Sequence, residues 1–178
     1  MSKGIPEHVD FIRAAKACGV YQGNYDIARM RRLVDYLADR HGQVSVDVTF
    51  GRNETKRYFF LKGTAAGRFS IPCQRCLEPM QQDIEVSFEL GLVEEEHYIK
   101  RLPEEVDPYL IKAVPDSLMG VIEDELILSF PSVVMHEQDQ CNATQYMKVN
   151  EGHSVTEQDE GKGNNPFAAL ESLKKELD

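Results

Sequence analysis

The clearest pattern in the chain is an alternation of apolar and polar residues that predicts β-strands. Every second residue is apolar in QVSVDVTF (43–50) and in DIEVSFELGLV (83–93), as expected for half-buried strands. Residues 56–73 between them are also expected to be extended, as two strands bent at Gly63 or Gly67, and GVYQGNYD (19–26) predicts a short strand or extended lead-in. No helix of crossover length separates these segments, so they predict an antiparallel meander.

Two further segments have the apolar spacing of helices. Ile27, Met30, Val34 and Leu37 follow Asp26, a candidate N-cap, and Gly42 supplies a stop, which predicts a helix near 27–40. The segment PDSLMGVIEDELILSFP predicts a second helix near 117–129, capped by Asp116 or Ser117 and ended by Pro131.

These elements predict an α+β fold, in which an antiparallel sheet or a partly closed barrel is packed by two main helices. We expect one domain over residues 1–147, with an acidic surface loop near 94–108. Residues 148–164 contain few apolar side chains, so they are expected to be an acidic disordered linker. Residues 165–178 predict a short amphipathic C-terminal helix.

Composition and cysteine usage indicate a cytoplasmic protein. The 178-residue chain has no apolar run long enough to cross a bilayer, and its first 20 residues lack the apolar core of a secretory signal. Four unevenly spaced cysteines fit a reducing compartment better than a disulfide scaffold. We therefore expect no membrane association.

Charge is divided unevenly along the chain. Residues 1–82 carry 13 Lys and Arg against 8 Asp and Glu, whereas the remainder carries 7 against 22. The basic half suits a polyanion such as RNA, although exposed arginines on a helix often only solvate it. The candidate RNA-binding residues are Arg29, Arg31, Arg32, Arg52, Lys56 and Arg57.

The stretch CQRC places Cys73 and Cys76 at a spacing that lets two thiolates share one tetrahedral zinc ion. His136 and Cys141 in MHEQDQC form a second close pair, so the four residues are a candidate structural zinc site with three cysteines and one histidine. The alternatives are two buried thiols without a metal and a redox pair. Redox chemistry is disfavoured because Pro79 works against a helix starting at CQRC, and a helix N-terminus is what lowers the thiol pKa in such pairs. Cys18, the fourth cysteine, is expected to be a small buried side chain.

Enzyme signatures are otherwise absent from the sequence. The chain contains no nucleophile elbow, P-loop, dinucleotide fingerprint or H-E-x-x-H motif. The acidic triplet Glu123, Asp124 and Glu125 is better explained as the polar face of the second helix than as an acid/base centre. The sequence therefore predicts a protein that is not an enzyme and has no small-molecule substrate.

Four stretches stand in an order that resembles one known family: YQGNYD, CQRC, VIEDELILSFPSVVMH followed by Cys141, and NPFAALESLKK. They are similar to the YceD family of large ribosomal RNA subunit accumulation proteins, over about residues 20–175. The matching residues are Cys73, Arg75, Cys76, Glu123, Asp124, Glu125, Pro131, His136, Cys141, Asn165, Pro166, Phe167 and Leu170.

The resemblance implies a non-catalytic factor in the synthesis, processing or stability of 23S ribosomal RNA, and hence in large-subunit biogenesis. Its implied partners are precursor ribosomal RNA, a ribosomal protein, or both. Some relatives carry a second C-x-x-C in place of His136 and Cys141, which keeps four metal ligands. Two further interpretations stay open, namely a thiol oxidoreductase that uses the CQRC pair and an acidic adaptor that shields a basic ribosomal protein.

Overall fold

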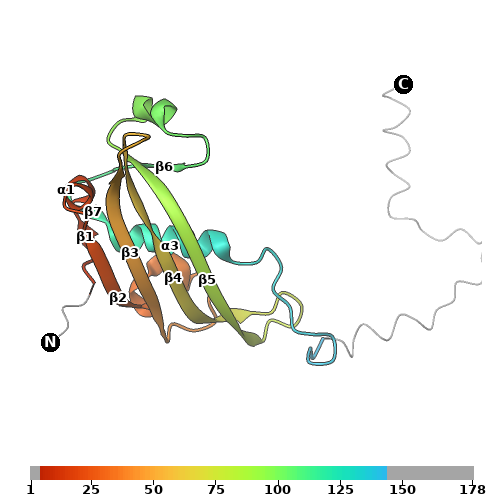
Figure 1. Cartoon of the computed structure of the whole chain (residues 1–178). Coiled ribbons are helices and arrows are strands. Elements are labelled where there is room, and N and C mark those ends of the chain that lie inside the picture. The colour runs from red at the N-terminus through yellow and green to blue at the C-terminus, as the bar shows by residue number, and fades with distance from the viewer. Residues whose placement is uncertain (1–4, 144–178) are drawn as a thin grey trace, which may run out of the picture. The chain divides into compact units, whose positions relative to one another are not determined.

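An open sheet with the strand order β2-β3-β4-β5-β6 forms the centre of the computed structural model, which describes residues 5–143 (Figure 1). Its strands are β2 (Val20–Asp26), β3 (Gln43–Asn53), β4 (Tyr58–Pro72), β5 (Pro79–Val93) and β6 (Asp107–Leu110). The first four are consecutive antiparallel neighbours, which confirms the predicted meander and the α+β class. The described strands do not close into a barrel.

The β4–β5 hairpin is the longest regular feature of the sheet. Its register runs without interruption from Phe59 opposite Leu92 to Pro72 opposite Pro79. The predicted bend at Gly63 or Gly67 was therefore wrong. Gly63 instead allows the backbones of β4 and β3 to lie close together, because a Cβ atom at this position would clash with the backbone oxygen of Asp47 on β3.

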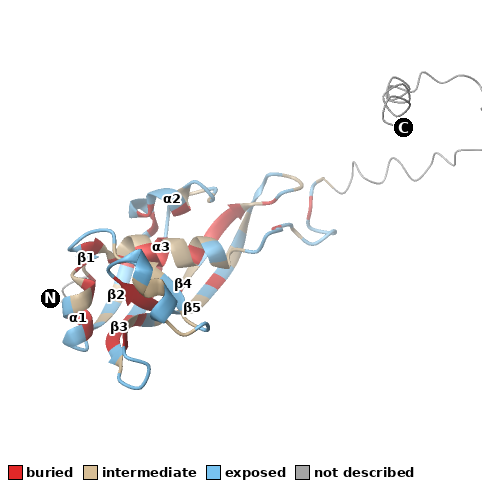
Figure 2. Cartoon of the chain, turned by 90° about the horizontal axis from the view of Figure 1, so that it is seen from above, coloured by how far each residue is buried: buried red, intermediate tan, exposed pale blue. Residues whose placement is uncertain are grey.

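Helix α3 (Leu118–Ser129) confirms the second predicted helix. The Ser117 side chain caps it by accepting a hydrogen bond from the Gly120 N–H at 3.0 Å. The helix crosses one face of the sheet (Figure 1), and its buried side chains join those of β3 and β4 in one core, seen as the red positions in Figure 2. The α3 residues in that core are Leu118, Val121, Ile122 and Leu126.

The first predicted helix was wrong. Residues 27–40 contain only a 3-10 turn, η1 (Ile27–Arg29), and a single helical turn, α2 (Arg31–Val34). Ile27, Met30 and Leu33 are all fully buried, and this spacing of three fits a 3-10 turn as well as an α-helix. After α2 the Ala38 N–H donates to Ser70 O on β4 at 2.7 Å, which ties the segment to the sheet and ends the helical path.

Several elements were not predicted. Helix α1 (Phe11–Lys16) is capped by Asp10, and strands β1 (His8–Val9) and β7 (Asp116–Ser117) form a separate antiparallel pair. The region expected as a surface loop contains the 3-10 helix η2 (Glu96–Arg101) and β6, which pairs in parallel with β5. Cys18 is exposed with a φ of 50°, so its predicted burial was wrong. The expected linker over 148–164 and helix over 165–178 lie outside the described residues.

Candidate functional site

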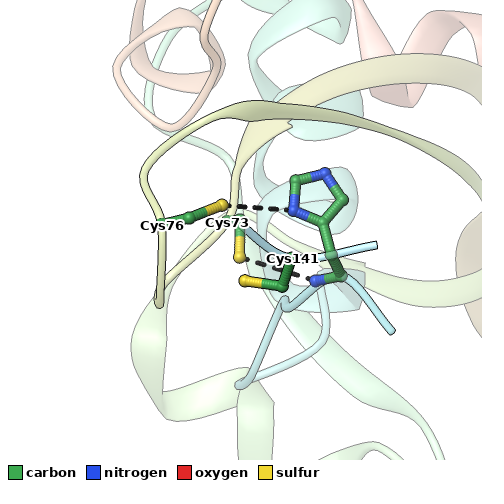
Figure 3. A group of neighbouring side chains, drawn as sticks. Cys73, Cys76 and Cys141 are labelled. Atoms are coloured by element: carbon green, nitrogen blue, oxygen red, sulfur yellow. Dashed lines mark hydrogen bonds between the residues drawn. The ribbon is translucent and has the colours of Figure 1, made fainter. Parts of the chain in front are cut away.

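Four metal-binding side chains from two distant segments converge beside the β4–β5 hairpin. Cys73 and Cys76 lie in the loop that joins the two strands, and His136 and Cys141 lie in the segment after α3. The three sulfurs and the imidazole nitrogen are all within 4.8 Å of one another. Figure 3 shows the labelled cysteine sulfurs facing a common space. The structure therefore brings together the four residues that the sequence singled out.

The loop is shaped by backbone hydrogen bonds that continue the hairpin. The Cys73 N–H donates to Glu78 O at 2.9 Å, and the Leu77 N–H donates to Cys73 O at 2.8 Å. Leu77 has a φ of 63°, a left-handed conformation that closes the turn. The Arg75 N–H lies 3.4 Å from Cys73 Sγ, which directs a donor at that sulfur.

The segment after α3, residues 130–142, is held against the loop by both backbone and side-chain contacts. The Gln74 N–H donates to Val134 O at 2.9 Å, and the Arg75 Nη2 donates to His136 O at 2.8 Å. The Asn142 amide donates to the Glu78 carboxylate at 2.7 Å. These supporting contacts join residues about 60 positions apart in sequence, so no local sequence pattern could have revealed them.

The environment of the sulfurs favours a thiolate at Cys73. Burial raises the pKa of this thiol, but the N–H groups of Cys76, His136 and Arg75 outweigh burial and lower its pKa to about 5. At Cys76 the Glu78 N–H lowers the pKa, but burial and the neighbouring thiols of Cys73 and Cys141 outweigh it, so the net shift is upward. A bound cation would remove this conflict by stabilising every thiolate at once.

The donor set fits zinc. A tetrahedral ion with bonds of about 2.3 Å sets its ligand atoms about 3.8 Å apart, so the cluster matches this spacing to within about 1 Å. Cys76 Sγ lies 3.3 Å from His136 Nδ1, which makes Nδ1 the nitrogen that faces the centre. Cys73 and Cys141 are buried, so little water reaches them. Four protein ligands leave no open position, which is the arrangement of a structural rather than a catalytic zinc site.

The predicted RNA-binding arginines near α2 line one hollow of about 630 Å³, together with Glu7 and Glu123. Arg29 pairs with Glu7, and Arg32 pairs with Glu123 and Asp124. Arg31 is exposed and has no carboxylate partner within residues 5–143. The structure thus brings the three together, but two of their charges are neutralised within the protein.

The second predicted group surrounds the turn between β3 and β4. Lys56 Nζ lies 3.1 Å from the Glu105 carboxylate, which belongs to the acidic region after η2. Arg52 lies 3.9 Å from Glu54 and packs over the Phe59 ring. Arg57 is exposed and, over the described part of the chain, its side chain has no carboxylate partner. This turn lies at the far end of the β4–β5 hairpin from the metal-binding loop.

The acidic triplet on α3 has divided roles. Glu123 is buried and accepts hydrogen bonds from α2, whereas Asp124 and Glu125 are half-exposed. Pro131 follows α3 and is exposed. Asn165, Pro166, Phe167 and Leu170 lie outside the described residues.

Comparison with known proteins gives two matches of the same kind. The family model described as "Large ribosomal RNA subunit accumulation protein YceD" matches residues 61–174. A Haemophilus influenzae protein named "Large ribosomal RNA subunit accumulation protein YceD" is 30% identical over 171 residues, which cover 96% of each chain. The chain belongs to the YceD family. The region matched by the YceD model includes the four clustered metal-binding residues, and it also reaches the NPFAAL motif.

No solved structure matches the chain. Among residues 5–143, no helix is both long and apolar enough to cross a membrane.

Proposed function

We propose that this YceD-family protein is a non-catalytic factor in the synthesis, processing or stability of 23S ribosomal RNA, acting in the cytoplasm during large-subunit biogenesis. The observation that carries the proposal is the match, over nearly the whole length of both chains, to a relative named for large ribosomal RNA subunit accumulation. The geometry of the metal-binding cluster supports a non-catalytic role, because all four of its donors face inward and leave no open metal position.

Precursor large-subunit RNA is the direct partner that the basic N-terminal half supports best. Arg31 and Arg57 are the predicted RNA-binding residues whose charges stay free of carboxylates in the described part of the chain. A ribosomal protein is the second candidate partner, because the C-terminal half carries a large excess of carboxylates.

Deleting the gene and measuring the ratio of 23S to 16S ribosomal RNA tests the cellular role, and the ratio should fall. Sedimentation of the tagged protein through a sucrose gradient, with and without RNase, tests the partner. Co-sedimentation with large-subunit precursors that RNase abolishes supports RNA as the partner, and RNase-resistant association favours a ribosomal protein. An unchanged ratio of the two RNAs in the deletion strain would refute the proposed function.

We also propose that Cys73, Cys76, His136 and Cys141 hold one structural zinc ion. When bound, the ion would crosslink the β4–β5 loop to the segment after α3, two parts of the chain that are about 60 residues apart in sequence. Arg75 supports this arrangement, since its Nε lies 3.0 Å from Cys141 Sγ. The positive charge of its guanidinium would offset part of the negative charge of the three thiolates.

Elemental analysis of protein purified without chelators should give about one zinc per chain. Cys73→Ser or Cys141→Ser should abolish binding, and Cys18→Ser is the matched control because Cys18 is exposed and outside the cluster. Cobalt provides a second measurement, since a tetrahedral site with three sulfur ligands and one nitrogen ligand gives intense visible absorption with Co²⁺. Zinc-free protein that also fails to bind Co²⁺ under reducing conditions would overturn the assignment.

A further inference from the structure

Helix α1, η2 and the β3–β4 turn lie at the same end of the sheet (Figure 1). Residues of these elements line two adjoining hollows. One, of about 290 Å³, lies between α1 and the segment after β6. The other, of about 180 Å³, lies between the β3–β4 turn, the end of β5 and η2. They share Ile12 and Glu94 as lining residues, so we treat them as one α1–η2 groove.

The α1–η2 groove is lined by cations that are free to bind an anion. Arg13 and Lys16 line the first hollow, and Arg57 and Arg101 line the second. All four are exposed, and within residues 5–143 none has a carboxylate in ion-pair distance. This separates them from Arg29 and Arg32 near α2, whose charges already meet carboxylates.

The acidic residues of the groove are fewer than its cations. Asp10 and Glu94 are the carboxylates that line it. Asp10 is already engaged, because its carboxylate accepts a hydrogen bond from the Arg13 N–H at 2.9 Å as the cap of α1. Among the side chains that line the groove, four cations therefore stand against two carboxylates, although the chain as a whole carries −10.

Apolar and aromatic surface lies between these cations. Phe59 and Tyr98 line the second hollow, and the Tyr98 ring is already covered by the Arg101 guanidinium, 4.6 Å from its centroid, and by the His97 ring at 4.0 Å. Ile12 provides aliphatic surface between the two hollows. A hollow of about 180 Å³ is small beside the usual ligand site of roughly 300–1,000 Å³, so it suits one flat ring rather than a whole cofactor.

We propose that the α1–η2 groove binds single-stranded RNA, with phosphates on its four cations and a base stacked on the Arg101 guanidinium that lies over Tyr98. Positive charge interleaved with aromatic side chains is the combination that single strands require, because their bases are free to stack on protein rings. A duplex keeps its bases stacked internally and offers no such contact. This inference rests on the proposal that precursor ribosomal RNA is a direct partner, and it names the surface and the form of RNA.

Fluorescence anisotropy with a labelled 12-nucleotide single-stranded RNA of mixed sequence tests the groove on the full chain. The variant Arg57→Gln/Arg101→Gln should weaken binding about tenfold and make the log–log salt dependence shallower by about 1.4. Arg40→Gln/Lys62→Gln removes the same charge from exposed positions outside the groove and should change affinity little. Tyr98→Ala should weaken binding about tenfold, whereas Tyr98→Phe keeps the ring and should bind like the unaltered protein.

The outcomes show whether the RNA site in the groove fails on its own or whether the proposed function fails with it. Equal affinity of the groove and control variants, or a larger loss in the control, would overturn the groove while leaving RNA as the partner. Binding of duplex RNA alone would also overturn it. If a synthetic peptide of residues 144–164 displaces the RNA, or occupies the groove where RNA does not bind, then the groove is a site for the chain's own acidic segment and the proposal fails.

Ultraviolet cross-linking of the unaltered protein provides a measurement that does not depend on variants folding. The RNA should cross-link to peptides containing Phe59 or Tyr98, and cross-links confined to residues 27–40 would contradict the proposal. The ratio of 23S to 16S RNA in a strain that carries only the groove variant gives the cellular readout. If the ratio is normal in that strain but reduced in the deletion strain, the proposed function in ribosomal RNA accumulation stands and the RNA site in the α1–η2 groove is rejected.

Discussion

Arg32 donates hydrogen bonds to the Glu123 carboxylate from both its backbone and its side chain. Its N–H lies 2.6 Å from Oε1, and its Nε and Nη2 lie 3.2 Å and 3.1 Å from Oε2. Nη2 also donates to Gly120 O at 3.0 Å, and Nη1 donates to Asp124. A guanidinium has five N–H donors, and nearly all are used within the protein. Arg32 therefore fixes α2 to α3 and is poorly placed to bind a phosphate.

Glu123→Gln should destabilise the protein by about 2 kcal/mol. The Glu123 carboxylate is buried and also accepts the Leu33 N–H at 2.9 Å, so the substitution turns an amide N–H₂ toward donors that lose their acceptor. Urea unfolding measures the loss. Glu125→Gln is the matched control, because burial, followed by the charges of Asp107 and Asp124, raises the pKa of Glu125. Removing that unfavourable charge should leave stability at neutral pH unchanged or slightly higher, and equal losses in the two variants would contradict the role of Glu123.

Asp116 should contribute stability that disappears in acid. Burial raises the pKa of its carboxyl, but the N–H groups of Lys112 and Ser117 and the Tyr109 hydroxyl outweigh burial and lower it. A lowered pKa in the folded state gives stability that is complete above the unfolded value of about 3.9 and is lost as the pH falls through the folded value.

Asp116→Asn should therefore cost about 1–3 kcal/mol at pH 7, and the difference from the unaltered protein should shrink below about pH 4. Urea unfolding at several pH values measures it. Tyr109→Phe removes one of the donors and should give a smaller loss. A difference between Asp116→Asn and the unaltered protein that stays constant from about pH 7 to about pH 3 would exclude the linkage.

Arg75→Gln should weaken retention of zinc, given that the proposed site is correct. The Arg75 side chain contacts Cys141 Sγ and His136 O, so it both positions that half of the site and offsets its charge. Release of zinc to a chromophoric chelator should be about tenfold or more faster in Arg75→Gln. Arg75→Lys keeps the charge without the planar fork and should be intermediate. Equal release rates in all three proteins would show that Arg75 has no part in holding the metal.

Leu77→Gly should stabilise the protein by about 0.5–1 kcal/mol. Leu77 has a φ of 63°, and a left-handed conformation costs a non-glycine residue about 1–2 kcal/mol, partly offset by the greater flexibility of glycine in the unfolded chain. The residue is 77% exposed, so little packing is lost. Leu77→Ala keeps the strain and is the control, expected to match the unaltered protein in thermal unfolding. A loss of stability in Leu77→Gly alone would mean that the turn is not strained.

The features that sequence predicted well depend on local periodicity. The strict alternation in β3 and the apolar stripe of α3 reflect burial on one face, which each segment shows by itself. The metal-binding residues were also recognisable, because two close pairs of ligands are conspicuous in a chain that contains only four cysteines. The sequence was enough to name the four residues, whereas only the fold shows that they lie together.

The errors arose where a distant contact determines the local structure. Residues 27–40 have helical spacing, yet Glu123 holds only one turn of α2, and the bond from Ala38 to Ser70 redirects the chain. The sequence places Arg32 and Glu123 about 90 residues apart, so no pattern could show that this arginine is already paired. Strand β6 is short and has little alternation, and its pairing depends on an exposed edge of β5 that the sequence does not reveal.

The uninterrupted register of β4 against β5 separates the metal-binding loop from the α1–η2 groove by a fixed length of sheet. Thirteen residue steps from Phe59 to Pro72 span roughly 43 Å at the usual rise of a strand. Substitutions at the two ends share no side-chain neighbours, so their effects on stability should add. A partner that contacts both ends at once must extend over this distance, which an extended peptide reaches only with about 13 residues or more.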